Sequence, residues 1–344
     1  MDVESRVRGA VARLAGGPPE ALPVRRLAGH ASMRSYWRVG EPPRSFVVMV
    51  LPDDRRPEEA TSGGAPSVDP FVDVQRYLRR IGVRVPAVQA FFEPEGLMVL
   101  EDLGDEMLET RLLAGAKAEP LYEAAVDQLA RMRAAAERAP DPSCVAFRRR
   151  FERDLYRWEL DHFREWLLEA WKGAALSPAE REVVDRAFDQ VSDALAAEPV
   201  GLTHRDYQSR NLMVLPGGEQ AVIDFQDALL GPRQYDLVAL LRDSYVELSA
   251  DLVERMIRRY LDRLAGEGGP RLDTGPFRET FDLLTVQRKL KDAGRFVFID
   301  RVKGNPGFLP SIPASLRYVR AALERRPDLA RLREVLAHHV PELG

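Results

Sequence analysis

The chain has 344 residues, 45% of them hydrophobic and 30% charged, which is ordinary for a soluble globular protein and leaves room for two lobes. Its formal net charge of -4 argues against a general nucleic-acid binder, which would normally be basic. The acidic start, the single cysteine (Cys144) and the lack of an apolar run near the roughly 20 residues that span a bilayer predict a cytoplasmic protein without membrane partners.

The N-terminal part of the chain predicts a small β-rich lobe. An amphipathic helix over residues 1–16 comes first, and a second helix over 71–81 carries its apolar residues on one face. The segment 54–69 is rich in Pro, Gly, Ser and acids, and it predicts a loop that is either a plain insertion or a lid. Strand patterns occupy 24–27, 36–39, 46–51, 88–92 and 97–100.

The remainder of the chain predicts a larger, helical lobe. A capping box with proline at the first helical position, Ser177 to Glu180, opens one helix. The aromatic stripe within 147–172 predicts core packing. The predicted helices are 121–139, 147–172, 178–197 and 248–264, followed by a helical tail from 313 to the end. The fold class is therefore α+β, with an N-terminal lobe over 1–102 and a C-terminal lobe over 103–344.

The stretch 203–227 carries the candidate chemistry. Two apolar runs, 212–215 and 221–223, are joined by a Pro/Gly turn, which predicts a β-hairpin. The hairpin returns Asp224 close to Asn211 and Asp206. A carboxylate that accepts the acceptor's proton, beside a carboxamide and a carboxylate that hold Mg²⁺, suits phosphoryl transfer. A solvated loop explains any one of these residues but not their joint spacing.

This stretch resembles the aminoglycoside phosphotransferase and choline kinase superfamily, small-molecule kinases with a two-lobe, protein-kinase-like fold. HRDYQSRNLMV (204–214) and IDFQDALLGPRQYDLVALLRDSY (223–245) are similar to a bacterial branch that contains the anomeric kinases of N-acetylmuramate and N-acetylglucosamine in cell-wall recycling. The likeness extends to 28–39, 70–103 and 287–298, so it covers most of the chain.

The resemblance implies a monomer that uses ATP, Mg²⁺ and an amino-sugar acceptor. Asp206 would be the catalytic base, with Asn211 and Asp224 as metal ligands. His204 would shape the loop, and Asp236 would brace it from within the core. The expected nucleotide-binding residues are Ser32, Arg34, Arg38, Glu101 and Leu103, the first in the turn over the phosphates and the last two at the hinge. The expected acceptor-site residues are Glu159, His162, Gln208, Asp227, Arg288 and Lys291.

Several of these assignments have alternatives. The third strand of most kinases offers a lysine to the phosphates, but Met49 stands at that place here. We expect Arg34 or Arg38 to supply the charge, because guanidinium groups suit bidentate phosphate contacts; both could instead be surface arginines. Arg288 and Lys291 could meet an anionic substituent or form a solvated basic helix face.

Two rival functions stay open at this point. One is an aminoglycoside, choline-like or other metabolite kinase on the same fold, since a fold fixes the reaction class better than the substrate. The other is a catalytically inactive, kinase-like binding protein, which Met49 motivates. The presence of Asp206, Asn211 and Asp224 together argues against it.

Overall fold

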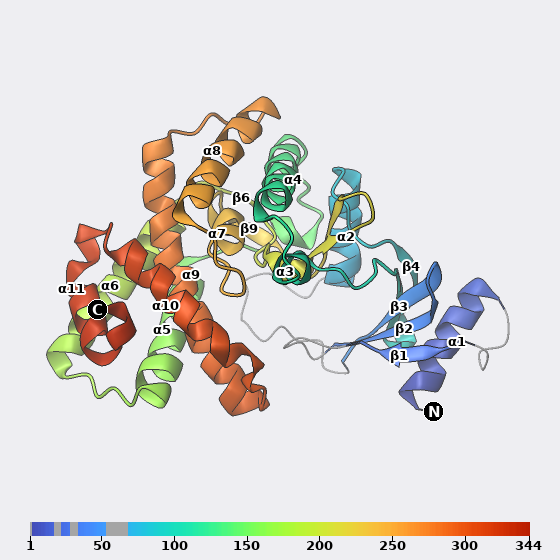
Figure 1. Cartoon of the computed structure of the whole chain (residues 1–344), viewed down its shortest axis with the longest axis horizontal. Helices are drawn as coiled ribbons and strands as arrows, with labels where there is room; N and C mark the ends of the chain where they lie inside the picture. The colour runs from blue at the N-terminus through green and yellow to red at the C-terminus, as the bar shows by residue number, and fades with distance from the viewer. Residues whose placement is uncertain (1, 17–21, 28–33, 53–67) are drawn as a thin grey trace.

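A five-stranded antiparallel sheet forms the centre of the N-terminal lobe in the computed structural model, which describes residues 2–16, 22–27, 34–52 and 68–344. The strand order is β1-β2-β3-β5-β4. The strands are β1 (Val24–Arg26), β2 (Ser35–Glu41), β3 (Arg44–Val50), β4 (Val88–Phe92) and β5 (Leu97–Glu101). Figure 1 shows this sheet at one end of the long axis and a larger, helical lobe at the other. The predicted α+β, two-lobe fold is confirmed.

The two faces of this sheet belong to different cores, because successive strand residues point to opposite faces. The row through Val48 and Val99 packs under helix α1 (Val3–Ala15) in a small separate cluster. The row through Met49 and Met98 joins the main core, which continues into the helical lobe. Met49 is fully buried there. The place of the missing lysine is therefore filled by an apolar side chain on the face toward the other lobe.

Helix α2 (Pro70–Arg80) connects the sheet to the segment that follows Asp224. Asp69 caps its first turn by accepting from the Phe71 N–H, and the Phe71 ring lies 4.7 Å from the ring of Phe225. Its one acid, Asp73, accepts a hydrogen bond from the Val145 N–H at 2.7 Å. The helix therefore packs against the segment after Asp224 through an aromatic pair, and its acid is used to order another turn.

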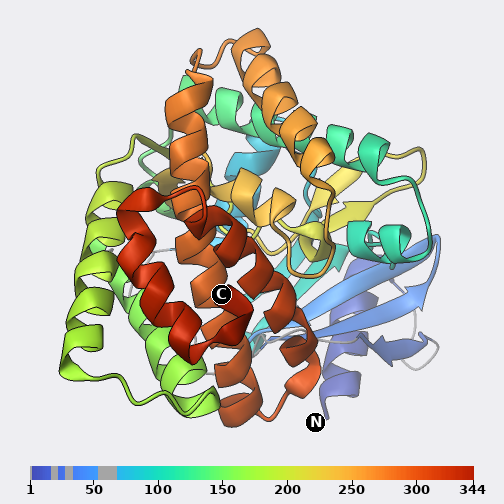
Figure 2. The same ribbon diagram turned by 60° about the vertical axis from the view of Figure 1, so that its left-hand side comes forward.

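The helical lobe is built around α9, the central helix of the layer seen in Figures 1 and 2. It packs against α5, α7 and α10. The α-helices of this lobe are α3 (Leu108–Leu113), α4 (Ala118–Arg138), α5 (Arg153–Phe163), α6 (Pro178–Ala196), α7 (Tyr235–Leu241), α8 (Ala250–Gly266), α9 (Thr274–Lys303), α10 (Ile312–Leu323) and α11 (Ala330–His339). The predicted helices over 121–139, 178–197 and 248–264 and in the tail are confirmed, as is the capping box at Ser177.

The prediction of one helix over 147–172 was wrong at its start, and the helix changes its type before it ends near the predicted residue. The helix begins at Arg153, because the preceding segment pairs with a strand: the Phe151 N–H donates to Leu230 O at 2.9 Å. After Phe163 the chain continues as a π-helix over Arg164–Trp171. A local pattern cannot show either change, since both depend on partners that are distant in the sequence.

The change to π-helix follows a close approach of α5 to α9. A Cβ atom added at Gly294 would lie 2.6 Å from the Phe163 Cα and 2.9 Å from the His162 carbonyl oxygen. Only glycine fits there without displacing backbone, so Gly294 allows the two helices to touch beside His162.

Replacing Gly294 with Ala is expected to destabilise the protein by about 1–3 kcal/mol, the usual cost of overpacking, despite the better helix propensity of alanine. Urea unfolding should show a lower midpoint with an unchanged slope. Gly266→Ala is the matched control, because nothing lies within 4 Å of its added Cβ. A Gly294→Ala protein as stable as the control variant would contradict the close approach.

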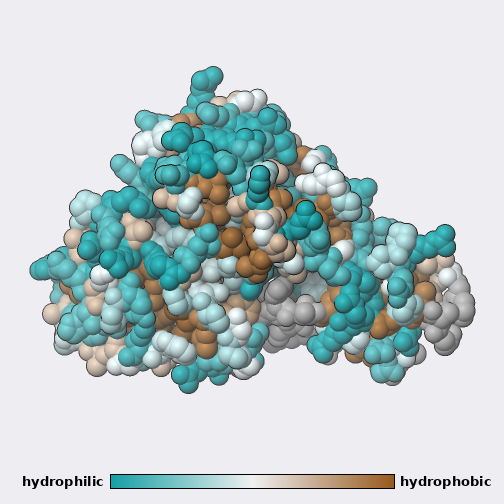
Figure 3. Space-filling view, in the orientation of Figure 1, coloured by the Kyte–Doolittle hydropathy of each residue, from teal (hydrophilic) through white to brown (hydrophobic). Residues whose placement is uncertain are grey.

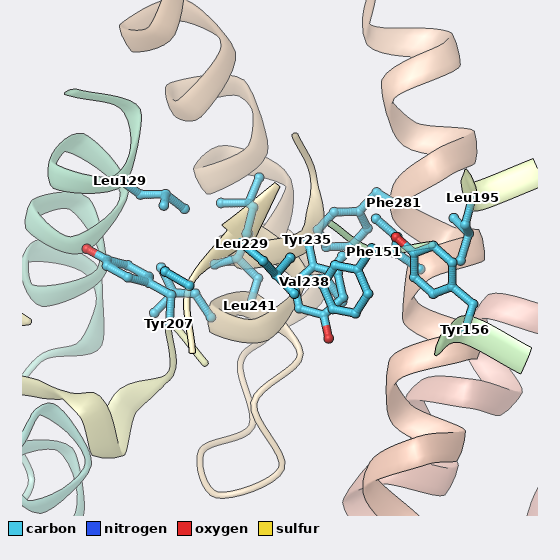
Figure 4. Packing of buried hydrophobic residues seen from close by; sticks show 14 of the residues in the cluster. Leu129, Phe151, Tyr156, Leu195, Tyr207, Leu229, Tyr235, Val238, Leu241 and Phe281 are labelled. Carbon is cyan, nitrogen blue, oxygen red and sulfur yellow. The ribbon is translucent and has the colours of Figure 1, made fainter. Parts of the chain in front are cut away.

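Four short strands position the candidate site. β6 (Val200–Thr203) pairs with β9 (Leu229–Pro232), and β7 (Leu212–Val214) pairs with β8 (Gln220–Val222) as the predicted hairpin. Beneath them lies the core shown in Figure 4, where Tyr207 and Leu129 lie on one side and Phe151, Tyr235 and Tyr156 on the other. Buried aromatic residues thus support the catalytic loop from below.

The sheet of the N-terminal lobe ends at Glu101, and the chain passes through 102–107 into α3. A lobe boundary at residue 102 stays a prediction, because the main core runs through both lobes. Figure 3 shows a largely hydrophilic face whose hydrophobic residues gather near its centre. Among the described residues, no helix combines the length and apolar character needed to span a bilayer.

Candidate active site

The catalytic loop is held by one buried carboxylate from α7. Asp236 is 1% exposed, and its two oxygens accept from the backbone N–H groups of His204 at 2.8 Å and Arg205 at 2.9 Å. Arg205 has a φ of 82°, in the left-handed region that residues other than glycine adopt rarely. These two hydrogen bonds fix the strained turn, so the bracing role predicted for Asp236 is confirmed.

His204 ties the catalytic loop to the strand that leads to Asp224. Its Nδ1 accepts from the Asp206 N–H at 3.2 Å, and its Nε2 lies 3.0 Å from the Ile223 carbonyl oxygen. With Nδ1 as acceptor, Nε2 carries the hydrogen and donates it to that oxygen. Both ring nitrogens are thereby engaged with backbone, which confirms the expectation that His204 shapes the loop.

Asn211 and Asp224 lie at the base of the hairpin, as the spacing predicts. The Asn211 Nδ2 donates to the Asp206 carbonyl oxygen at 2.8 Å, so its carboxamide oxygen is the atom available as a ligand. Asp224 is exposed and has a φ of 63°. Gln226, which is buried, donates from its Nε2 to Asp224 at 2.9 Å and to Asp227 at 3.1 Å. One amide therefore orients both carboxylates.

The electrostatics at Asp224 favour a cation. Although part of Asp224 is open to solvent, the protein packed around its carboxyl raises the pKa above the ordinary value by desolvation; the hydrogen bond from Gln226 opposes this, and the carboxylates of Asp206 and Asp227 raise the pKa further. Carboxylate and carboxamide oxygens are the ligands that Mg²⁺ prefers, and it commonly takes only one or two from protein, the rest from phosphates and water. The side chains of Asn211 and Asp224 fit that ion.

Asp206 is paired with Arg288, which reaches it from α9. The Arg288 Nη2 donates to Asp206 Oδ1 at 3.0 Å, and its Nη1 donates to the Arg205 carbonyl oxygen at 2.7 Å and to the Tyr235 hydroxyl at 2.9 Å. Arg288 is 1% exposed, so it does not lie on a solvated basic helix face. Its donors serve the catalytic loop, which makes it a positioning residue; a contact with an anionic substituent is untested.

This pairing keeps Asp206 ionised. Burial acts to raise the pKa of its carboxyl, but Arg288, Lys291 and Arg205 outweigh that effect and hold the pKa below its ordinary value. The side chain of Asp206 is 35% exposed and so remains accessible to an acceptor. The geometry suits a carboxylate that orients a hydroxyl and accepts its proton late in the reaction.

The turn before Asn211 is clamped from two sides. Asp243 is 1% exposed, and its Oδ2 accepts from the Ser209 N–H at 2.9 Å and from the Ser209 hydroxyl at 2.5 Å. On the other side, Arg210 pairs with Glu109 of α3 through two contacts of 2.9 Å, and its guanidinium lies 3.5 Å from the centroid of the Tyr245 ring. Sequence reasoning missed both acids, because no spacing identifies partners this distant.

On the acceptor side, Glu159 and His162 of α5 are both buried. The Gln287 Nε2 donates to Glu159 at 2.6 Å, and the Arg205 guanidinium lies 3.5 Å from its other oxygen. The His162 ring stacks on Trp158, with centroids 5.3 Å apart, and its Nε2 has no hydrogen-bond partner among the described residues. Burial, with a smaller effect of nearby cations, lowers the pKa of His162 to about 4, so its ring is neutral.

The other predicted acceptor residues border the same region. Lys291 is nearly buried, and its Nζ lies 3.6 Å from Asp292. The backbone of Gln208 donates to the Asp206 carbonyl oxygen and accepts from the Asn211 N–H, both at 2.9 Å. Asp227 is half-buried beside Gln226. Their roles toward a substrate stay predictions.

Two of the predicted nucleotide-binding residues, Arg38 and Glu101, are engaged in ion pairs. Arg38 is 5% exposed, and its guanidinium contacts Asp102 at 2.6 and 2.8 Å and Asp105 at 2.7 Å. It therefore joins β2 to the predicted hinge, where two carboxylates already occupy its donors. Glu101 likewise pairs with Arg84 through contacts of 2.5 and 2.9 Å.

Leu103 lies at the edge of a cavity of about 270 Å³, between residues 103–106 and the β7–β8 turn at 214–218. The side chains of Asp206, Asn211 and Asp224 do not line this cavity, so it adjoins the predicted hinge rather than the predicted reaction centre. Ser32 and nearly all of the predicted 54–69 loop lie outside the described residues.

Arg34 directly precedes β2, and its side chain lies beside that of Tyr36. The two side chains are hydrogen-bonded to each other. Burial raises the pKa of the Tyr36 hydroxyl to about 12, the carboxylates of Asp224 and Asp227 add to this effect, and Arg34 opposes it. Such coupling requires proximity, so the Tyr36 hydroxyl lies near Asp224, and the guanidinium of Arg34, the residue before β2, lies beside that hydroxyl.

Comparison with known proteins gives one sequence family. The sequence pattern of the phosphotransferase enzyme family matches residues 23–273. N-acetylmuramate/N-acetylglucosamine kinases are similar over most of their length: that of Pseudomonas putida is 32% identical over 89% of this chain and 85% of its own length. The relative from Pseudomonas aeruginosa is 33% identical (93% and 88%), and that from Neisseria meningitidis is 32% identical (91% and 89%).

Solved structures share the fold at low identity. A choline/ethanolamine kinase family protein from Mesorhizobium loti superposes with a TM-score of 0.59 at 18% identity, covering 98% of both chains. A choline kinase from Streptococcus pneumoniae gives 0.58 at 14% identity, covering 93% of this chain and 98% of its own. These solved structures establish the fold of the chain. The choice of acceptor rests instead on the N-acetylmuramate/N-acetylglucosamine kinases described above.

Proposed function

This chain belongs to the phosphotransferase enzyme family and is an ATP-dependent phosphotransferase, and we propose that it phosphorylates the anomeric hydroxyl of N-acetylmuramate or N-acetylglucosamine. The observation that carries the proposal is that relatives about a third identical over some nine-tenths of this chain are named as kinases of both sugars. The convergence of Asp206, Asn211 and Asp224 on one hairpin supports catalysis rather than an inactive scaffold.

In this proposal the protein supplies mainly positioning and charge, since phosphoryl transfer asks little covalent chemistry of the enzyme. Asp206, held ionised by Arg288, orients the acceptor hydroxyl and takes its proton. Asn211 and Asp224 would hold Mg²⁺, which neutralises phosphate charge when bound. Gln226 and Asp243 keep these two ligands in position through direct and backbone contacts.

The acceptor site would lie along α5 and α9, close to the catalytic loop. Glu159, His162 and Lys291 interact electrostatically with one another or with that loop, and all three are largely buried. Beside the 42% exposed ring of Trp158, the His162 Nε2 is enclosed by protein and has no hydrogen-bond partner among the described residues, so a polar atom lies next to an aromatic face. That pairing suits a sugar, which presents hydroxyl groups and an apolar ring face.

The test is an ADP-release assay with Mg-ATP and four acceptors: N-acetylmuramate, N-acetylglucosamine, an aminoglycoside and choline. Turnover with the sugars, accompanied by loss of their reducing end, is the expected result. Turnover with only the aminoglycoside or choline would show that the proposed acceptor is wrong, while the kinase activity would stand. If no acceptor supports ADP release and the protein binds no nucleotide, the alternative of a catalytically inactive, kinase-like binding protein is favoured.

Arg34 is the better candidate for the phosphate-binding cation, because carboxylates at the hinge already occupy Arg38. Replacing Arg34 with Ala is expected to raise the KM for ATP by about 10–100-fold, corresponding to one charge-assisted hydrogen bond of about 1.5–3 kcal/mol. Steady-state kinetics measure this directly. The control is Arg44→Ala, which removes an exposed arginine from the neighbouring strand.

For Arg38→Ala we expect loss of stability instead, because Asp102 would keep its burial and lose its charged partner. If Arg34→Ala and Arg38→Ala both leave the nucleotide KM and kcat unchanged, neither arginine replaces the missing lysine.

The Asp243 clamp yields a prediction about metal dependence. In Asp243→Asn the amide cannot accept from Ser209 and Tyr245 as the carboxylate does, so the turn that carries Asn211 should loosen. We expect the Mg²⁺ concentration for half-maximal activity to rise by about 10–100-fold, as for other outer-shell partners of metal ligands. Glu247→Gln, a nearby exposed acid, serves as the control. An unchanged Mg²⁺ requirement would limit Asp243 to a structural role.

A further inference from the structure

A second set of potential metal ligands lies away from the catalytic loop, where α11 meets α6. The ligand atoms of Glu180, His338 and His339 all lie within 4.8 Å of one another. In the described part of the chain, this is the single place where three or more His, Cys, Asp or Glu side chains converge so closely. Figure 1 shows α6 and α11 at the end of the molecule opposite the sheet.

Hydrogen bonds within the protein already hold Glu180 and His339 of this set in place. One oxygen of Glu180 accepts from the Ser177 N–H at 2.9 Å and the Ser177 hydroxyl at 2.7 Å in the capping box of α6. Its other oxygen lies 3.1 Å from the Nε2 of His339. His338 is exposed and adjoins His339, with ring centroids 4.7 Å apart. One carboxylate oxygen and one imidazole are thus aligned, and a second imidazole can rotate toward them.

We propose that Glu180, His338 and His339 bind a transition-metal ion, with Zn²⁺ as the best match. Imidazole nitrogen and carboxylate oxygen are typical zinc ligands, and three protein ligands leave a fourth position for water. Ligand atoms at about 2.0–2.2 Å from a tetrahedral ion lie about 3.3–3.6 Å apart. The proposal requires the exposed His338 side chain to rotate so that its ring nitrogen comes from within 4.8 Å of the other ligand atoms into that range.

Such an ion would join the start of α6 to the end of α11. These two helices pack against each other, and the C-terminal turn Pro341–Leu343 follows directly. The site would therefore stabilise the C-terminal end of the fold rather than take part in phosphoryl transfer. The competing explanation is a simple ion pair between Glu180 and His339, without metal.

Calorimetric titration of Zn²⁺ into the zinc-free full chain, with saturating Mg²⁺ present, tests the site. We expect one zinc ion per chain and, in excess zinc, a Tm higher by about 2–4 °C. His338→Gln and His339→Gln should each weaken binding by more than about 100-fold, since even outer-shell partners of a metal contribute 10–100-fold. Glu180→Gln should also weaken it while keeping the capping box, which accepts glutamine.

Glu334→Gln, an exposed acid on the same helix, is the matched control and should bind zinc as the unaltered protein does. Kinase turnover in Mg-ATP, expected to be unchanged in the His338 variant, shows that it is folded. Absence of zinc binding in the unaltered protein, or binding that survives both histidine substitutions, overturns the proposal and leaves the ion pair.

Discussion

Replacing Asp206 with Asn is expected to lower kcat by at least about 10²-fold, the low end for removal of a general base. The amide has nearly the same shape, but it cannot accept the acceptor's proton, and its charge no longer matches Arg288. The KM for ATP should change little, because the side chain faces the acceptor in the proposed reaction. Steady-state kinetics with saturating Mg-ATP measure both quantities, and a variant that retains most of its activity would exclude Asp206 as the base.

The pH dependence follows from the pKa of the same carboxyl. Arg288, Lys291 and Arg205 outweigh the effect of burial and hold this pKa below its ordinary value of about 3.9. The stability that Asp206 contributes is therefore present above the unfolded-state pKa and is lost as the pH falls through the folded-state value. We expect no loss of kcat from protonation of Asp206 above about pH 5. An acidic limb near pH 6 that disappears in Asp206→Asn would contradict this account.

Local sequence patterns predicted what depends on neighbours along the chain. The hairpin that carries Asn211 and Asp224 was predictable because two short apolar runs and a Pro/Gly turn specify it without tertiary context. The capping box at Ser177 was predictable for the same reason. The bracing by Asp236 came from the family resemblance, and the two backbone hydrogen bonds confirm it.

What could not be predicted depends on contacts between distant segments. Arg288 lies 82 residues from Asp206, and only the packing of α9 against the catalytic loop brings them together. Arg38 lies 64 residues from Asp102, so its use at the hinge was equally hidden. The late start of α5 has the same origin, because Phe151 hydrogen-bonds to β9 instead of continuing a helix. Tertiary partners, rather than local propensity, decide such positions.

Taken together, these contacts show a catalytic loop held from three helices. Asp236 of α7 fixes its backbone, Arg288 of α9 fixes its carboxylate, and Glu109 of α3 holds the turn that follows through Arg210. Each contact involves a charged group that is largely buried, and such groups are costly unless paired. Removing one member should therefore affect stability and catalysis at the same time.

Asp236→Ala is the clearest case, with an expected loss of about 2–6 kcal/mol of unfolding free energy. Two backbone N–H groups, those of His204 and Arg205, would remain buried without an acceptor, at about 1–3 kcal/mol each. Arg205 would also lose the contact that holds its left-handed conformation, so Asp206 should move. We expect kcat of the folded fraction to fall by about 10²-fold or more, because small displacements in an active site are costly. Urea unfolding and kinetics at low temperature measure the two effects.

Asp236→Asn separates the two effects of Asp236, because it preserves volume and one acceptor oxygen. We expect it to retain more stability than Asp236→Ala, yet to lose much of the activity, since its NH₂ group would face one of the two backbone donors. Asp262→Ala, which removes an exposed acid from α8, should leave both quantities unchanged. If Asp236→Asn is less stable but fully active when folded, the carboxylate serves the fold alone. Loss of activity at nearly normal stability would show instead that the position of Asp206 depends on both hydrogen bonds.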